Sequence, residues 1–331
     1  MRNVAWDWRN AAFGAVISSV AATVIAFGHI ETGLGLLIGA IPAAIVGLPP
    51  RRRDRRRVLI VGILFGASQM FGSILAQWTP VAVVGMFLLG LGAALLTTRS
   101  AMGWVVLTLC LPLAGIGLTY TGLAESAGVS FLFILGSAIA FIGALCFPEY
   151  EAPSRRDPPL LGMRVAREYG VRLGLAAAVG TAIGLHYGAD HTGWIVGSTL
   201  LVMRPSEEMM QLRGAGRALS VFAGGVIAAW LLTLYLSPVA IAIVGAGAIV
   251  AMAATNASRW YVTPAFTTFL ILWSLLHDQA TAENIKFRFS ERVLETLLGV
   301  GIAYFFGLLV PTLLRRRTDR SPAPLAEQQS G

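Results

Sequence analysis

Two arginines one helical turn apart are the residues of this chain best suited to binding chemistry. Arg213 and Arg217 open an apolar run, and Trp194 lies in the short apolar run before them. A spacing of four puts both guanidinium groups on one helix face, where they can hold a carboxylate bidentately. The indole of Trp194 can stack on an aromatic ring. The alternative is that the arginines anchor helix ends and Trp194 belongs to an interfacial belt; the sequence leaves both open.

A related pattern occurs about 160 residues earlier in the chain. Arg53 and Arg57 match Arg213 and Arg217, and one shift holding over this distance predicts an internal repeat. The apolar runs 33–48 and 192–203 are short in both copies, and such matched segments are typical of a transporter site. Arg53 and Arg57 are therefore candidates as well. They also belong to a run of six arginines, which the charge bias of membrane proteins explains as a topological anchor.

Three threonines near a proline form a second candidate group. Thr263, Thr267 and Thr268 lie within about one turn of Pro264. They either bond the carbonyl groups that the proline leaves free or line a substrate path, because polar residues within membrane spans often mark pathways.

Three titratable side chains lie close together in the sequence, at the expected outer membrane face. His186, Asp190 and His191 are weak candidates for proton coupling, because histidine titrates near neutral pH. The bland interpretation is that they are solvated loop residues at helix ends. Their spacing does not favour a metal site, since ligands on a helix are three or four residues apart, and no cofactor is expected.

Composition places the elements that carry these residues in a lipid bilayer. The 331 residues are 56% hydrophobic and 13% charged, with mean hydropathy +0.72, whereas a soluble domain carries about 25% charge. A spanning helix needs about 20 residues. Twelve apolar runs are candidates: 11–28, 33–48, 58–77, 80–97, 101–122, 127–147, 171–186, 191–203, 216–236, 239–255, 260–277 and 293–311.

The basic charges indicate the orientation of these spans. With twelve spans and a cytoplasmic N-terminus, 22 basic residues fall inside and three outside, namely Lys286, Arg288 and Arg292. The net charge of +8 is then topological, and no nucleic-acid motif accompanies it. The run before Arg204 is the weakest span. We expect its helix to begin near Tyr187 and Arg204 to reach the interface.

The expected fold is all-α, a polytopic membrane protein of about twelve transmembrane helices in two parallel six-helix repeats. Both termini would be cytoplasmic. The expected parts are a first membrane half (1–150), a cytoplasmic linker (151–170), a second half (171–317) and a disordered cytoplasmic tail (318–331).

Sequence signatures of an enzyme are missing. There is no GxSxG, no HExxH and no glycine-rich loop ending in GK. Cys110 and Cys146 fall inside expected spans without a nearby second thiol, so they indicate neither a disulfide nor a metal site. We expect no enzyme activity.

The second half resembles the fusaric acid resistance protein-like family, the aromatic acid exporters. The resemblance covers about residues 165–311 and uses a basic residue opening a helix, a tryptophan, a turn, an R-x3-R pair and an R-x3-T-x2-G element. Gly193 replaces the usual aromatic before the tryptophan, and Arg204 replaces the usual glutamine of the turn. These elements are Arg172, Trp194, Arg204-Pro205-Ser206, Arg213 with Arg217, and Arg292 with Thr296 and Gly299.

The resemblance implies a bacterial inner-membrane exporter of aromatic or other organic acids, driven by a proton or membrane gradient. Its expected partners are the lipid bilayer and a small organic anion, with no nucleic acid, and a homo-oligomer is compatible with it. A passive anion channel would have much the same sequence. A non-transporting scaffold or lipid-interacting subunit is the other alternative, because every acidic residue is expected in or beside a loop.

Overall fold

The computed structural model describes residues 5–151, 159–187, 192–256, 262–277 and 282–313. Within these ranges the fold is all-helical, as predicted. Each of the twelve apolar runs contains a helix. The elements are α1 (Trp8–Ala26), α2 (Ile30–Val46), α3 (Arg52–Ala76), α4 (Thr79–Leu96), α5 (Ala101–Val105), η1 (Val106–Cys110), α6 (Leu111–Gly117), α7 (Leu123–Leu145), α8 (Met163–His186), α9 (Gly193–Val202), α10 (Glu207–Thr233), α11 (Pro238–Ala254), α12 (Val262–His277), α13 (Ala282–Tyr304) and η2 (Phe305–Leu309).

The protein is an integral membrane protein. Apolar side chains such as Leu88, Phe131, Leu219 and Ile243 are exposed on the helices, and only lipid can cover such a surface. Six helical stretches described by the structure are long and apolar enough to cross a bilayer. They are Trp8–Ala26, Arg52–Ala76, Thr79–Leu96, Leu123–Leu145, Glu207–Thr233 and Phe289–Leu313.

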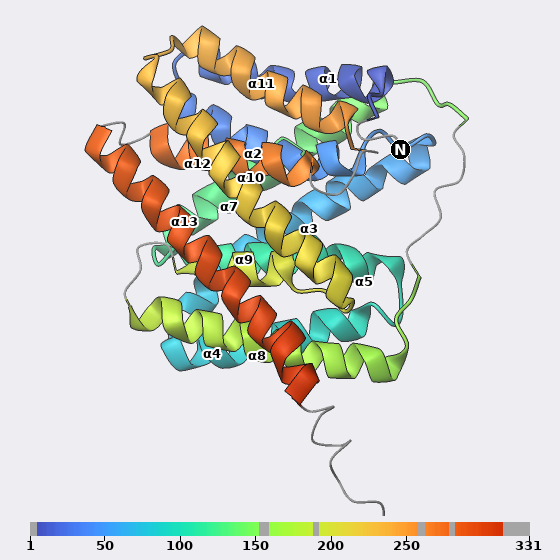
Figure 1. Cartoon of the computed structure of the whole chain (residues 1–331). Coiled ribbons are helices and arrows are strands. Elements are labelled where there is room, and N and C mark those ends of the chain that lie inside the picture. The colour runs from blue at the N-terminus through green and yellow to red at the C-terminus, as the bar shows by residue number, and fades with distance from the viewer. Residues whose placement is uncertain (1–4, 152–158, 188–191, 257–261, 278–281, 314–331) are drawn as a thin grey trace, which may run out of the picture.

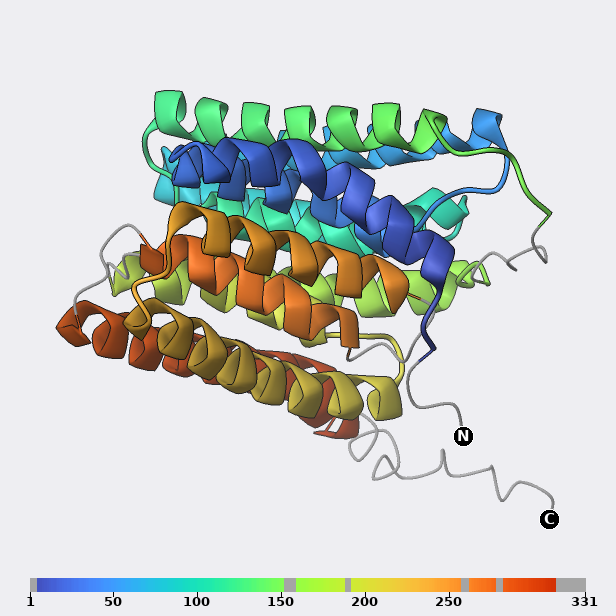
Figure 2. The same cartoon turned by 90° about the horizontal axis from the view of Figure 1, so that it is seen from above.

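The helices run side by side in one bundle (Figures 1 and 2). α1 packs along α11 and α4 packs along α8. α7 packs on α2 and α3, while α13 packs on α9 and α10. α1 begins and η2 ends at the same end of the bundle (Figure 2). α8 begins at Met163, inside the segment predicted as a linker.

The two short helices are enclosed by the others. α2 packs against α1, α7 and α11, and α9 packs against α6, α8 and α13. α9 begins at Gly193, so the expected start near Tyr187 is wrong. Its 10 residues give about 15 Å of helix, half of a bilayer core. A helix that is surrounded by protein does not need to reach either lipid surface, because its neighbours satisfy its ends.

Glycines let these helices approach closely. A Cβ at Gly39 would lie 2.5 Å from the carbonyl oxygen of Phe133, and a Cβ at Gly136 would collide with the carbonyl oxygen of Leu36. Ser137 donates to the Gly39 oxygen at 2.6 Å. The α2–α7 contact is therefore built from backbone against backbone, as small residues allow in membranes.

We predict that Gly136→Ala destabilises the protein by about 1–3 kcal/mol, because the added methyl group overpacks a backbone contact. The matched control is Gly128→Ala on the same helix, where a Cβ meets no atom within 4 Å. Thermal unfolding in detergent should show a lower Tm for the first variant and an unchanged or higher Tm for the second. Equal Tm values would contradict the close packing of α2 on α7.

Candidate functional site

The contact between α9 and α13 positions the candidate site. A Cβ at Gly299 would lie 2.6 Å from the carbonyl oxygen of Ile195, so only glycine allows α13 to lie this close to α9. The Thr199 hydroxyl donates to the Gly299 carbonyl at 3.1 Å and ties the two helices together. Arg292 and Thr296 are seven and three residues before Gly299 and share its helix face. They are therefore held against α9.

Arg292 stacks on Trp194 at this contact. The guanidinium carbon lies 3.3 Å from the centroid of the indole, and both side chains are buried. On its own helix, Arg292 pairs with the buried Glu295, with 3.5 Å between Nη1 and Oε2. The aromatic face attracts the desolvated cation, and the carboxylate keeps the buried charge from being left unpaired. Thr296 and Ser198 are also buried beside them.

A second buried arginine approaches from α10. Arg217 is 8% exposed and donates from Nη1 to the hydroxyl of Thr268 on α12 at 2.9 Å. The positive charge of Arg217 repels the positive charge of Arg292. Among the described residues, the Nε of Arg217 has no hydrogen-bond partner. Two guanidinium groups and an indole from three helices thus meet inside the bundle; we call Trp194, Arg217, Thr268, Arg292 and Glu295 the central cluster.

The central cluster corrects two expectations. Arg292 does not lie in an outer loop but is 2% exposed within α13. Glu295, which is 4% exposed, is a carboxylate buried within a helix, so the expectation that every acidic residue lies in or beside a loop is wrong. The R-x3-T-x2-G spacing was the signal that could have identified Arg292, because it puts the arginine on the face that packs closely.

A cavity of about 440 Å³ adjoins the central cluster. Its wall combines aromatic side chains, including Phe65, Phe133 and Trp194, with the carboxylates of Glu31 and Glu125. Trp194 belongs both to this wall and to the stack on Arg292.

Tyr120, another residue of the cavity wall, lies between α6 and α7. The phenol of Tyr120 can donate a hydrogen bond to a ligand in the cavity.

Arg213 does not join Arg217, although both lie on α10. Arg213 is half-buried and interacts electrostatically with Arg204 and Tyr169. Arg204 is buried rather than placed at the interface as expected. Burial lowers the pKa of Arg204, and the phenol of Tyr169 opposes this shift. The predicted pair is therefore divided between two environments.

The other two candidate arginines stay outside the site. Arg53 and Arg57 are exposed on α3. The buried member of this run is Arg55, which is 0% exposed. Its guanidinium donates to the carbonyl oxygens of Pro49, Ala144, Phe147 and Pro148, at 3.3, 2.8, 2.7 and 2.9 Å. Arg55 therefore joins the end of α7 to the start of α3.

The remaining candidates are dispersed. Thr267 is half-buried on α12, and the side chain of Thr263 lies outside the described part. His186 is exposed at the end of α8, where its ring packs edge-on against Tyr187. Asp190 and His191 lie outside the described residues. No group of three or more metal-binding side chains occurs among the residues that the structure describes.

The comparisons with known proteins address the second half. A family model described as fusaric acid resistance protein-like matches the chain from residue 175 to residue 306. Residues 175–306 are therefore similar to this family. This confirms the resemblance, and the family is one of membrane transporters. The central cluster lies entirely within the matched stretch, whereas Tyr169 and Arg172 precede it. No curated protein and no solved structure matches the chain.

We predict that Arg55→Gln destabilises the protein by about 3–5 kcal/mol, because a buried guanidinium and the four carbonyl groups that it bonds lose each other. Arg53→Gln, two residues away and exposed, should change stability by less than about 0.5 kcal/mol. Chemical unfolding in detergent micelles compares the two variants. If both were equally stable, Arg55 would not join α7 to α3.

Proposed function

We propose that this protein exports organic acids across the bacterial inner membrane and that aromatic carboxylates are its favoured substrates. The observation that carries the proposal is the burial of two guanidinium groups, Arg217 and Arg292, whose charges act on each other and of which Arg292 lies over the indole of Trp194. The fusaric acid resistance protein-like match over the same residues supports a transport role.

The central cluster supplies what an aromatic carboxylate requires. Arg217, Arg292 and Glu295 together carry one net positive charge inside the bundle. Buried charges attract each other more strongly than charges in water, so a substrate carboxylate is favoured there. Arg217 has a free donor at Nε within the described part of the molecule, and charge-assisted hydrogen bonds to carboxylates are among the strongest in proteins.

The adjoining cavity fits the rest of such a substrate. Phe65, Phe133 and Trp194 offer aromatic faces in a space of about 440 Å³, and a benzene ring stacks favourably on such faces. Movement of the indole away from Arg292 would join the cavity to the guanidinium groups. In this proposal Trp194 is both a contact for the substrate ring and the barrier between cavity and cluster.

The driving force for export can come from the membrane potential. An anion that leaves a cell with a negative interior gains about 2.3 kcal/mol per charge and 100 mV. A proton gradient is the alternative source.

The proposed architecture is twelve spans in two parallel repeats with cytoplasmic termini. The helix contacts support it, because they occur in matched pairs. α1 packs on α11 as α8 packs on α4, and α2 packs on α7 as α9 packs on α13. α1 packs on α2 as α8 packs on α9. If the twelve apolar runs are numbered in chain order, with run 1 following run 12, then advancing every helix by six runs converts one set of contacts into the other.

The alternative of a non-transporting scaffold is no longer supported, because it depended on the expected absence of buried charge. Arg217, Arg292 and Glu295 are all buried within helices, and intramembrane ionisable residues usually serve a function. The passive channel remains as an outcome of the flux experiment.

We predict that Arg217→Gln reduces benzoate flux into proteoliposomes at least about ten-fold, because losing a charged hydrogen bond costs about 1.5–3 kcal/mol. Arg57→Gln is the matched control: Arg57 is the repeat counterpart and is exposed on α3. Its flux should equal that of the unchanged protein. Equal flux for both variants, with normal folding, would contradict the role of Arg217.

Flux of the unchanged protein tests the function itself. Proteoliposomes would be offered aromatic and aliphatic carboxylates with an imposed voltage or pH gradient. Saturable flux that prefers aromatic acids is expected. Flux that follows voltage without saturating would favour the channel, and the absence of flux for every acid would overturn the transport proposal.

A further inference from the structure

A second group of basic side chains lies where α8 meets the turn between α9 and α10. Arg204, in this turn, is 5% exposed. Its Nη1 donates to the carbonyl oxygens of Leu200 and Met203 at 3.1 and 2.6 Å. Its Nε and Nη2 are buried and have no hydrogen-bond partner among the described residues. A buried donor without a partner is costly, so these two groups point to a ligand.

Tyr169 completes the environment of Arg204. The phenol is 1% exposed and donates to the carbonyl oxygen of Met203 at 3.1 Å. The phenol also interacts electrostatically with Arg204 and opposes the effect of burial on this guanidinium. A neutral phenol compensates a positive charge far less than a carboxylate does.

The charges of two further arginines act on Arg204 and Tyr169. Arg213 on α10 is close enough to Arg204 for their charges to repel, and Arg172 acts on Tyr169 from one turn along α8. Arg172 donates to the carbonyl oxygen of Gly307 at 3.3 Å. An anion bound to the unpartnered donors of Arg204 would also be attracted by these two positive charges.

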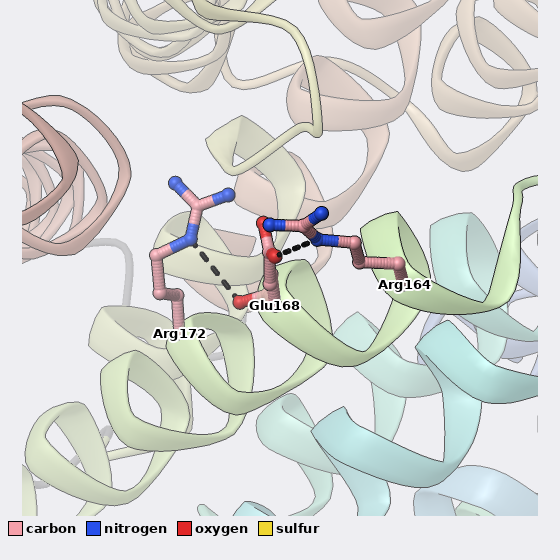
Figure 3. A network of polar contacts seen from close by, with 3 residues as sticks. All are labelled: Arg164, Glu168 and Arg172. Carbon is pink, nitrogen blue, oxygen red and sulfur yellow. Dashed lines mark hydrogen bonds and ion pairs between the residues drawn. The ribbon is translucent and has the colours of Figure 1, made fainter. Parts of the chain in front are cut away.

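The nearest acidic residue on α8 is directed elsewhere. Figure 3 shows that the carboxylate of Glu168 faces Arg164, with 3.0 Å between Oε1 and Nε. Arg172 instead donates its Nε to the backbone oxygen of Glu168 at 3.2 Å. The pair of Arg164 and Glu168 is exposed, so it belongs to the surface and not to the buried arginines.

We propose that Tyr169, Arg204 and Arg213 form a second anion site, separate from the central cluster, that binds one carboxylate or phosphate group. We call it the inner site, because it lies toward the expected cytoplasmic side. Arg213 lies one helical turn, about 5.4 Å, before Arg217. An anion held by Arg213 is thus one turn from the central cluster. The inner site would then be the first place at which an exported anion binds. This role rests on the proposed function, whereas anion binding at the inner site does not.

The test counts bound anions. The full-length protein would be placed in nanodiscs of phosphatidylcholine and titrated with radiolabelled benzoate, with protein-free nanodiscs as background. Two benzoate ions per chain are expected. Arg213→Gln should bind one and Arg217→Gln should bind one, because each variant removes a different site. Arg213→Lys should keep two, with affinity at the inner site lowered about ten-fold, since lysine keeps the charge but not the planar donors.

Arg164→Gln is the matched control. This variant removes one positive charge, as Arg213→Gln does, but the side chain of Arg164 on α8 is 92% exposed. It should therefore still bind two ions. Size-exclusion chromatography and circular dichroism would establish that each variant is folded. If Arg213→Gln bound as many ions as the unchanged protein, the inner site would be overturned. If Arg217→Gln alone kept the full number, the central cluster would fail instead and the inner site would stand.

A parallel titration identifies the source of the anion. With one third phosphatidylglycerol in the nanodiscs, a count that falls from two to one assigns the inner site to a lipid phosphate. A count of two in both lipids assigns it to a free carboxylate. A count of one in both lipids, unchanged in Arg213→Gln, would overturn the inner site.

Discussion

The close contact of α9 with α13 is the constraint on which the candidate site depends. Gly299 removes the side chain that would separate the two backbones, and Thr199 bonds its carbonyl oxygen. Arg292, seven residues before Gly299 on α13, then lies over the indole of Trp194. The lack of hydrophobic driving force between membrane helices makes such packing and interhelical hydrogen bonds decisive.

The enclosure of α9 by other helices allows polar side chains to lie at its contact with α13. α9, with ten residues, is shorter than a bilayer core is thick, and its burial on all sides lets polar groups lie beside it away from lipid. α2 is enclosed in the same way in the first half, yet the contacts there are apolar or made by backbone and serine. The surroundings of α2 and α9 therefore differ in charge, because the buried Arg292 packs against Trp194 of α9.

Four arginines of the second half form two groups. The charges of Arg204 and Arg213 act on each other and on Tyr169, and the charge of Arg217 acts on Arg292. Each guanidinium is held by neighbours that differ in kind: backbone oxygens for Arg204, a threonine for Arg217, and an indole with a carboxylate for Arg292. A series of partly compensated positive charges suits a path for anions better than one deep charge, because a ligand can leave each place as well as reach it.

The sequence by itself determined the helices, because a span needs a length of apolar residues that composition reveals directly. It also identified the membrane location and the short apolar runs at 33–48 and 192–203, and it proposed Trp194, Arg217 and Thr268, which the structure places in one buried cluster. It could not show which arginines are buried. Arg55 rather than Arg53 or Arg57 turns inward, Arg213 parts from Arg217, and Arg292 lies inside rather than in a loop. These outcomes depend on how each helix is rotated and how deep it lies. Contacts such as Gly299 with Ile195 set both, and they join residues about a hundred positions apart in the chain. Only the tertiary structure decides them.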